Sequence, residues 1–371
     1  MYTLIFIAAL ILLVVCVLNL PAFGSLPKGP RLARIKALPN YKDDALQNLS
    51  FTPMKPDGVT YGDMIKGMLK GNKNGRPKKT LPVVAPDFSP ASGLKVIWFG
   101  HSSYFLQADG LNILVDPVFS ERTSPFSFIG TKRYAGTDFV KPEDFPELDI
   151  VLITHDHYDH LDYQSILKLK GKTRRFITSL GAGAHLERWG VPADRITELI
   201  WGEEIPASGL TFTALPARHF TGRKFKRNQS AWSAFVLQTA AARLYLGGDS
   251  GYDRHFKAAG DAYGPFDLAI LECGQYNTYW PYIHMFPEQT VQAALDLKAK
   301  VLLPVHWGKF TLAMHDWNDP IKRVVKKAAE ENLKITTPLM GESVILGEYY
   351  PAKEWWLDLD EAQTISGKNV L

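Results

Sequence analysis

Short apolar runs bounded by turn residues recur from about residue 95 to residue 350. In the first half, runs at 96–99, 104–107, 112–115, 150–154 and 175–178 predict strands, and 183–189 predicts a helix. In the second half, runs at 210–215, 232–237, 243–246, 268–271 and 301–305 predict strands, with helices at 287–298 and 320–331. Strands interspersed with helices indicate an α/β domain. Two such halves fit two packed sheets covered by helices.

The first twenty residues carry a different pattern. Residues 2–20 are uncharged and apolar apart from a few polar positions such as Thr3 and Asn19. This length is near the ~20 residues that span a bilayer as a helix, so we expect a single N-terminal transmembrane anchor. The alternatives are a signal peptide cleaved after residues 22–24 and a buried core helix. The basic residues that follow favour a bacterial inner-membrane protein with its domain in the cytoplasm by the positive-inside rule; they are Lys28, Arg31, Arg34 and Lys36.

Residues 21–94 are rich in proline, lysine and polar residues and show no clear long helix or strand, so we expect an extended arm. Six basic residues in this arm either contact anionic lipid headgroups or belong to a solvated loop; they are Lys66, Lys70, Lys73, Arg76, Lys78 and Lys79. Residues 351–371 are expected to form a C-terminal tail.

Composition excludes some classes of protein. With 371 residues, 46% hydrophobic and 22% charged, the chain can bury a large core and is not disordered overall. A net charge of +4 is small for a dedicated nucleic-acid binder, so we expect no nucleic-acid partner. Two cysteines offer no disulfide framework.

The residues that carry chemistry concentrate directly after the run at 150–154. The sequence T-H-D-H-Y-D-H-L-D places His155, His157, Asp159 and His160 within six residues. Burying such a cluster is costly unless a divalent metal offsets the repulsion and desolvation. If the strand direction persists, His155 and His157 point to one side, while Asp159 and His160 can turn to a second position. The cluster therefore predicts a metal site and allows two metals.

Four residues cannot complete two metal shells, because each metal needs three or four protein ligands. Three further positions follow apolar runs: His219, Asp249 and His306. The carboxyl ends of strands are where ligand sites in layered α/β folds gather. A single histidine after a strand is more often structural. Three positions with the same placement, beside H-x-H-x-D-H, favour the metal site instead.

This set of motifs resembles the metallo-β-lactamase-fold hydrolases, because H-D-H-Y-D-H-L-D is followed in order by A-R-H, G-G-D-S and V-H-W-G. The segments W-F-G-H-S-S at 98–103, D-P-V-F-S at 116–120 and K-R-Y at 132–134 are similar, more narrowly, to the branch of N-acyl-phosphatidylethanolamine-hydrolysing phospholipase D and its bacterial relatives. The resemblance covers about residues 23–350. It implies an αββα sandwich, which we expect over residues 95–350.

The resemblance also implies a ligand set. One metal would be held by His155, His157 and His219, and the other by Asp159, His160 and His306, with Asp249 as the bridge. Nitrogen and carboxylate donors without thiolate suit two Zn²⁺ ions, although Fe or Mn accept the same donor types. Two metals lower the pKa of a shared water toward neutrality and neutralise the oxygens of a phosphoryl group.

Other residues are expected to support this centre. His101 and Asp116 would hydrogen-bond metal ligands and so orient them; the alternatives are a core histidine for His101 and an Asp-Pro turn for Asp116. The resemblance places His284 near the scissile phosphate, where it would orient an oxygen or protonate the leaving alcohol, so we group it with Asp159 and Asp249 as catalytic residues. Aromatic residues from Tyr276 to Phe286 either form an apolar lip for acyl chains or pack beneath a loop.

A basic segment follows the motif A-R-H. It either attracts an anionic phosphodiester or lies in a solvated surface loop; its residues are Arg218, Arg223, Lys224, Lys226 and Arg227.

The function implied by the resemblance is that of a membrane-associated dinuclear zinc phosphodiesterase of phospholipase D type. It would cleave N-acyl-phosphatidylethanolamine-like phospholipids to N-acylethanolamine and phosphatidic acid by hydroxide attack on phosphorus. The main alternative is a lactonase or ester hydrolase acting on a small polar substrate; β-lactamase and nuclease activities are less favoured. A non-enzymatic metal-binding membrane protein is disfavoured because all seven ligands are present. The expected partners are a phospholipid substrate and a membrane, and a homodimer is implied by resemblance alone.

Overall fold

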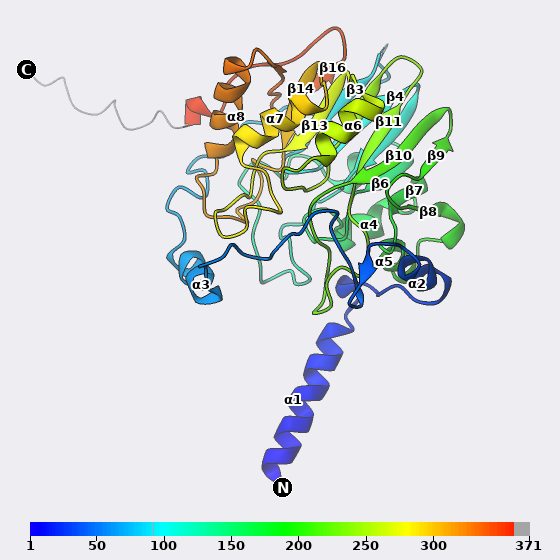
Figure 1. Ribbon diagram of the computed structural model, residues 1–371, viewed down its shortest axis with the longest axis vertical. Helices are drawn as coiled ribbons and strands as arrows, with labels where there is room; N and C mark the ends of the chain where they lie inside the picture. Colours follow the sequence, from blue (N-terminus) through cyan, green and yellow to red (C-terminus); the bar gives the residue numbers. More distant parts are fainter. Residues whose placement is uncertain (92, 360–371) are drawn as a thin grey trace, which may run out of the picture.

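The strands that follow residue 94 form two seven-stranded sheets in the computed structural model, which describes residues 1–91 and 93–359 (Figure 1). The first sheet has the order β16-β3-β4-β5-β6-β7-β8. Its strands are β3 (Lys95–Trp98), β4 (Tyr104–Ala108), β5 (Leu111–Val115), β6 (Leu148–Ile153), β7 (Thr173–Ser179), β8 (Ile196–Leu199) and β16 (Ser343–Ile345).

The second sheet has the order β15-β14-β13-β12-β11-β10-β9. Its strands are β9 (Glu204–Ala207), β10 (Leu210–Pro216), β11 (Ser233–Gln238), β12 (Arg243–Leu246), β13 (Leu268–Glu272), β14 (Val301–Val305) and β15 (Lys334–Ile335). In each sheet the pairing is antiparallel on one side and parallel on the other, and the parallel strands are β5 to β8 in the first sheet and β12 to β15 in the second.

Side-chain alternation explains why the strands read as continuous apolar runs. In β3, Val96 and Trp98 enter the cluster shared with the second sheet, whereas Ile97 joins a cluster on the opposite face. β6 divides in the same way, with Leu152 in the shared cluster and Val151 in the other. Because both faces are covered, the central strands such as β13 and β14 are apolar at nearly every position.

Helices cover the outer faces of both sheets (Figure 1). The outer helices are α4 (Tyr163–Leu169), α5 (Gly183–Arg188), α6 (His255–Tyr263), α7 (Pro287–Asp296) and α8 (Asp319–Glu330). Ile166 of α4 and Leu186 of α5 lie in the core beside the first sheet. Phe256 of α6, Val291 of α7 and Val324 of α8 lie in the core that includes the second sheet. The α/β sandwich predicted from the apolar pattern is confirmed.

The arm before the sandwich has more structure than its composition indicates. It contains α2 (Gly29–Lys36), the hairpin of β1 (Tyr41–Lys42) and β2 (Ala45–Leu46), and α3 (Tyr61–Lys70). A reciprocal capping box starts α3: Thr60 Oγ1 accepts the Asp63 N–H at 3.1 Å, and the Asp63 carboxylate accepts the Thr60 N–H at 2.9 Å. The expectation of an arm without a clear long helix is therefore wrong at α3, which runs for ten residues.

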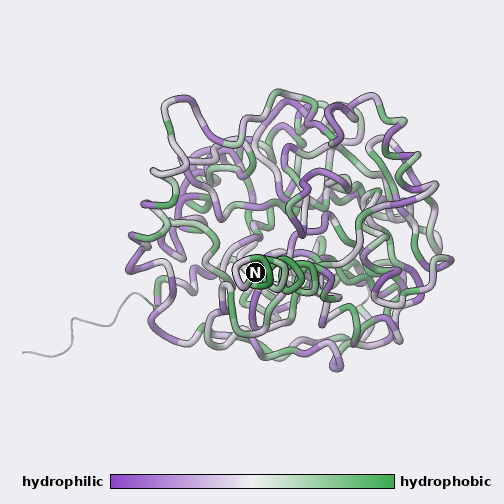
Figure 2. Tube along the Cα trace, turned by 90° about the horizontal axis from the view of Figure 1, so that it is seen from below, coloured by the Kyte–Doolittle hydropathy of each residue, from purple (hydrophilic) through white to green (hydrophobic). Residues whose placement is uncertain are grey.

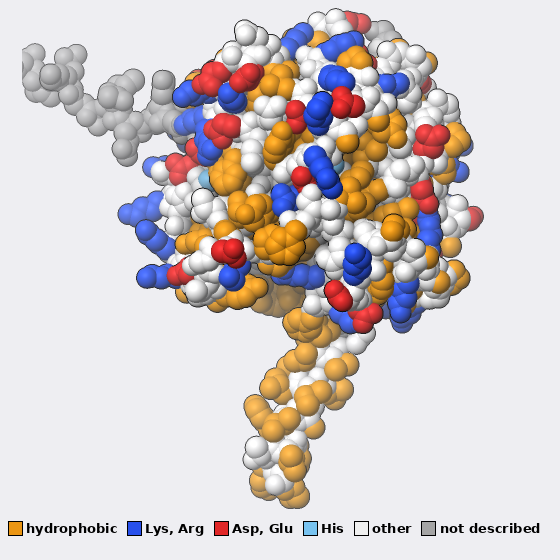
Figure 3. Space-filling model, in the orientation of Figure 1, with side chains coloured by type: hydrophobic (Ala, Val, Ile, Leu, Met, Phe, Trp, Pro, Cys, Tyr) orange, Lys and Arg blue, Asp and Glu red, His pale blue; other side chains and the backbone are white. Residues whose placement is uncertain are grey.

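The first helix, α1 (Tyr2–Leu18), projects away from the sandwich, and apolar side chains surround it (Figures 1, 2 and 3). Its 17 residues end before Asn19, and Leu20 adopts an extended conformation ahead of Pro21. At 1.5 Å per residue α1 is about 26 Å long, less than the roughly 30 Å of a bilayer core. Within the described residues no helix combines the length and the apolar character needed to cross a membrane. The predicted transmembrane anchor at 2–20, and with it the inner-membrane localisation, is therefore wrong.

Candidate metal centre

The carboxyl ends of the parallel strands bring the predicted donors together. Asp116 directly follows β5 and His155 lies two residues after β6, while Asp249 and His306 follow β12 and β14. Small residues allow this approach: a Cβ on Gly248, beside Asp249, would lie 2.9 Å from the Thr154 Cβ and 3.0 Å from the Ser233 carbonyl oxygen. All seven donors predicted from the sequence lie in two neighbouring groups, and within each group the ligand atoms are within 4.8 Å of one another.

The first group consists of His155, His157, His219 and Asp249. His157 Nδ1 lies 2.9 Å from His155 Nε2 and 3.2 Å from His219 Nε2. Asp249 Oδ2 lies 3.8 Å from His155 Nε2 and 3.6 Å from His219 Nε2. Three ring nitrogens and one carboxylate oxygen therefore converge on one point.

The second group consists of His101, Asp159, His160 and His306. His160 Nε2 and His306 Nε2 lie 3.2 Å and 3.1 Å from Asp249 Oδ1, the oxygen that faces away from the first group. Asp159 Oδ2 is 3.5 Å from His306 Nε2 and 2.9 Å from His101 Nε2. Asp249 thus presents one oxygen to each group, as a bridging ligand would.

The donor set fits two divalent metal ions. Among the described residues, His160 Nε2 and His306 Nε2 approach Asp249 Oδ1 at 3.2 and 3.1 Å, yet none of these three buried atoms forms a hydrogen bond. Buried polar atoms are rarely left without a hydrogen bond, so these atoms indicate a cation site. In the first group, His157 Nδ1 faces both His155 Nε2 and His219 Nε2 within 3.2 Å. In each pair of neutral rings only one nitrogen can donate a hydrogen bond, and the other must accept with its lone pair.

Burial and nearby charges shift the pKa values of His155 and His219 in the first group and of His306 in the second in opposite directions. Burial holds the pKa of His155 and His219 well below the usual value for histidine, so both rings are neutral and can offer a lone pair. Burial would also lower the pKa of His306, but Asp249 and Asp159 raise it to about 10. The second group therefore carries carboxylate charge that a divalent cation would neutralise.

Asp116 fixes the orientation of His160. Its Oδ2 lies 2.7 Å from His160 Nδ1 and accepts the Thr154 hydroxyl at 2.7 Å, while Oδ1 accepts the Thr154 N–H at 2.8 Å. This leaves His160 Nε2 for the centre. Asp116, His101 and His306 all have left-handed backbone conformations, with φ of 42°, 53° and 67°. Strained backbone of this kind commonly gathers at functional sites.

Asp156, between the two histidines of the motif, anchors the loop. Its carboxylate accepts the Gly222 N–H at 2.8 Å and the Ser230 hydroxyl at 2.7 Å, and it pairs with His185 at 3.2 Å. The guanidinium of Arg223 donates to the Asp156 carbonyl at 2.9 Å. The loop that carries His155 and His157 is therefore rigidly held from the side opposite the donors.

Glu272, the last residue of β13, was not predicted from the sequence. Its buried carboxylate accepts the Ser250 N–H at 2.7 Å and lies 3.0 Å from His284 Nδ1. Burial raises the pKa of Glu272, and the contact with His284 opposes that shift. The Nδ1–H of His284 donates to Glu272, which leaves Nε2 free to face the cleft. An acidic residue ending an apolar strand was the available signal.

A cleft of about 450 Å³ opens over the donors. Its floor includes His157, Asp159, His219, Asp249, His284 and His306. Its walls are largely apolar and include Met54, Met64, Met68, Phe220, Trp280, Ile283 and Leu312. Two of the methionines belong to α3, so the arm forms part of the wall.

The basic segment after A-R-H and the aromatic segment before Phe286 each had two interpretations from the sequence, and the structure divides each segment between the cleft and the interior. Of the basic segment after A-R-H, Arg227 lines the cleft and stacks on Phe220, whereas Arg223 is buried and binds backbone carbonyls. Of the aromatic segment, Trp280 lines the cleft. Tyr276 is buried and hydrogen-bonds Asp319 instead.

The chain has relatives across bacteria, archaea and animals. The family model of the Beta-lactamase superfamily domain matches residues 111–307. An uncharacterized protein of Mycobacterium tuberculosis is 40% identical over 339 residues, which cover 88% of this chain and 91% of that protein. N-acyl-phosphatidylethanolamine-hydrolyzing phospholipase D 1 of Caenorhabditis elegans is 33% identical over 295 residues, which cover 74% of this chain and 81% of that protein.

A solved structure agrees with the fold. Igni18, a metallo hydrolase from the archaeon Ignicoccus hospitalis, aligns with a TM-score of 0.52 at 23% identity and covers 68% of this chain and 98% of its own. The family model, the two relatives and the solved structure support the resemblance that the motifs indicate. The chain belongs to the metallo-β-lactamase superfamily and is a metal-dependent hydrolase.

Proposed function

We propose that the protein is a dinuclear zinc phosphodiesterase of phospholipase D type, which hydrolyses N-acyl-phosphatidylethanolamine-like lipids to N-acylethanolamine and phosphatidic acid. The observation that carries this proposal is the combination of a floor of metal donors and apolar walls in one cleft of about 450 Å³. A small polar substrate would leave those walls without a role. The relation to the C. elegans phospholipase D adds support.

The walls suit an acyl chain. Met64 and Met68 come from α3, and Trp280 and Ile283 come from the loop after β13. Flexible methionines adapt to chains of differing length and unsaturation. Arg227, at the cleft, supplies a positive charge for the phosphodiester.

His155, His157, His219 and Asp249 would hold one zinc ion, and Asp159, His160, His306 and Asp249 the other. When bound, the two ions would lower the pKa of a water and neutralise the phosphoryl oxygens. In the reaction, water oxygen bonds to phosphorus and the bond from phosphorus to the ethanolamine oxygen breaks. The leaving oxygen needs a proton, and we assign its delivery to His284 Nε2, because Glu272 holds Nδ1 and stabilises the charged ring.

The test is hydrolysis by the zinc-loaded protein of N-acyl-phosphatidylethanolamine in detergent micelles, beside a bis-aryl phosphodiester and a simple lactone. We expect release of N-acylethanolamine, and we expect Asp249→Asn to abolish it because the variant loses the bridging carboxylate. Turnover of the lactone with both phosphodiesters untouched would overturn the proposal and move the chemistry to a carbonyl carbon.

A further inference from the structure

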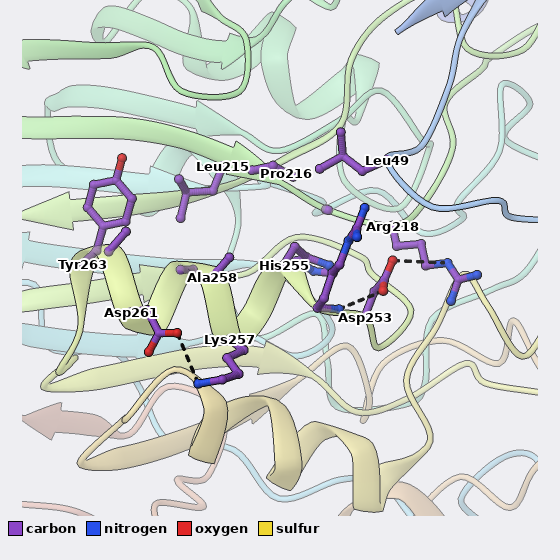
Figure 4. A pocket seen from close by; sticks show the side chains of 14 residues that line it. Leu49, Leu215, Pro216, Arg218, Asp253, His255, Lys257, Ala258, Asp261 and Tyr263 are labelled. Carbon is purple, nitrogen blue, oxygen red and sulfur yellow. Dashed lines mark hydrogen bonds and ion pairs between the residues drawn. The ribbon is translucent and has the colours of Figure 1, made fainter.

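A second hollow, of about 530 Å³, lies outside the metal centre (Figure 4). It runs between α6 and the end of β10, and we call it the α6 groove. Leu215 and Pro216 of β10 and Leu49 of the arm form one side, and the face of α6 from His255 to Tyr263 forms the other. Its volume falls within the roughly 300–1,000 Å³ of small-molecule sites.

The groove stays open because α6 presents small side chains to it. Ala258, Ala259 and Ala262 lie on the groove face at helical spacing, so no large side chain fills the space. Leu49, on the opposite side, is 54% exposed. A ligand chain lying along the groove would therefore remove apolar surface from water, which is favourable by roughly 25 cal/mol per Å².

Charge gathers at the end of the groove where α6 begins. Arg254 occupies the N-cap position, no side chain caps the helix, and its first turn has no acidic residue. Within residues 1–91 and 93–359 the guanidinium of Arg254 has no hydrogen bond or ion pair. The start of a helix favours an anion through its free N–H groups and its dipole.

The other charged groups around this end largely pair with one another. Asp253 accepts the Arg254 N–H at 2.8 Å and lies 4.0 Å from Arg218, and Lys257 lies 3.2 Å from Asp261. Asp261 also pairs with Lys298 at 2.8 Å. Lys257 and Asp261 lie farther along α6 and pair with each other, so at the start of the helix one carboxylate, that of Asp253, faces two guanidinium groups, those of Arg218 and Arg254. This end of the groove therefore has net positive charge.

We propose that the α6 groove binds a single-chain anionic amphiphile, with its chain between Leu215 and the alanines of α6 and its carboxylate or phosphate at Arg254 and the start of α6. The apolar length selects the chain and the positive end selects the anion. A cationic amphiphile would meet Arg254 and Lys257. The site is distinct from the cleft over the metal donors, with which it shares no lining residue.

The groove adjoins two of the metal donors through the chain. Arg218 precedes His219, and the Arg218 N–H donates to the hydroxyl of Ser250, which follows Asp249, at 2.9 Å. The Arg218 guanidinium lies over the Tyr282 ring at 4.8 Å, beside Ile283, whose carbonyl accepts His219 Nδ1–H at 2.8 Å. An amphiphile in the groove would therefore contact residues that position His219 and Asp249, so we expect it to change the turnover rate.

Calorimetric titration of the full-length protein with dodecanoate, dodecyl phosphate and dodecanol, each below its aggregation concentration, tests the site. We expect both anions to bind about tenfold tighter than dodecanol, the gain from one charge-assisted contact of ~1.4 kcal/mol. Dodecanoate and dodecyl phosphate distinguish a fatty-acid head from a phosphate head. Equal affinity for the anions and the alcohol, or no binding of either anion, would overturn the proposal.

Variants locate the binding site. Ala258→Phe fills the groove and should abolish binding, whereas Ala329→Phe, at an exposed position of α8, is a matched control that should leave it unchanged. Arg254→Gln, an exposed change that keeps the groove open, should weaken anion binding about tenfold and leave dodecanol unaffected. If Ala258→Phe binds normally and Met68→Trp in the metal cleft does not, the amphiphile occupies the cleft and the proposal is wrong. Thermal unfolding of each variant verifies that it is folded.

Discussion

Replacing Glu272 by glutamine tests how the centre delivers a proton. The carboxylate lies 3.0 Å and 3.2 Å from His284 Nδ1 through its two oxygens and also accepts the Ser250 N–H. Glutamine has the same size and can still accept from Ser250, so the fold and the donor geometry should persist. What disappears is the negative charge that stabilises protonated His284, and the Glu272→Gln amide can offer N–H to Nδ1 instead of accepting from it.

The expected size of the effect follows from that single contact. A hydrogen bond to a charged group contributes about 1.5–3 kcal/mol. If the contact matters when His284 gives up its proton, the loss corresponds to a fall in kcat of roughly 10- to 100-fold. The assay is steady-state hydrolysis of N-acyl-phosphatidylethanolamine by the zinc-loaded variant, together with its metal content. We expect KM and zinc content close to those of the unaltered protein.

A double variant separates positioning from a purely structural role. If Glu272 acts through His284, adding Glu272→Gln to His284→Ala should lower kcat no further than His284→Ala alone. A variant Glu272→Gln with unchanged kcat would refute the reasoning. Loss of zinc in the same variant would also refute it, because Glu272 would then act on the metal site.

Three further predictions concern metal affinity, pH and substrate length. Asp116→Asn should weaken metal binding roughly 10- to 100-fold, as measured by competition with a chelator, because it removes the acceptor that orients His160; unchanged affinity would contradict the role given to Asp116. Burial lowers the pKa of Lys309 to about 7. Between pH 7 and about 10.4, Lys309 is therefore protonated in the unfolded chain but not in the folded chain. The free energy of unfolding should rise with pH in this range, by at most ~1.4 kcal/mol per pH unit. Urea unfolding at several pH values should show that this rise is absent in Lys309→Met. If the free energy of unfolding rises equally with pH in both proteins, the low pKa of Lys309 is excluded. Met68→Asp should raise KM for long-chain lipids about tenfold, equivalent to ~1.4 kcal/mol, but leave hydrolysis of a bis-aryl phosphodiester nearly unchanged; equal effects on both substrates would show that Met68 does not contact the acyl chain.

The sequence predicts the sandwich and the donor cluster because their signals are local. Each sheet strand that precedes a donor is a largely apolar run, and its predicted bounds agree with the structure within about two residues, as at Val301–Val305. His155, His157, Asp159 and His160 follow one strand, so their proximity is built into the chain. His219, Asp249 and His306 are brought to the same edge because parallel and neighbouring strands end there.

The features that the sequence analysis missed depend on contacts between distant segments. Glu272 belongs to no motif, and its role is visible only from its contact with His284. Two glycines, Gly62 and Gly67, weaken the helix signal of α3, whose place at the cleft comes from packing of the arm against the domain. The membrane prediction failed for a local reason, because counting apolar residues overlooked where Asn19 and Pro21 end the helix.

Hydrolysis of N-acyl-phosphatidylethanolamine by the zinc-loaded protein in oxygen-18 water, with mass analysis of both products, tests the proposed chemistry most directly. Attack on phosphorus places the heavy oxygen in phosphatidic acid and leaves N-acylethanolamine unlabelled, which is the predicted result. Label in N-acylethanolamine would show cleavage at carbon, and the absence of both products would contradict the phospholipase D assignment.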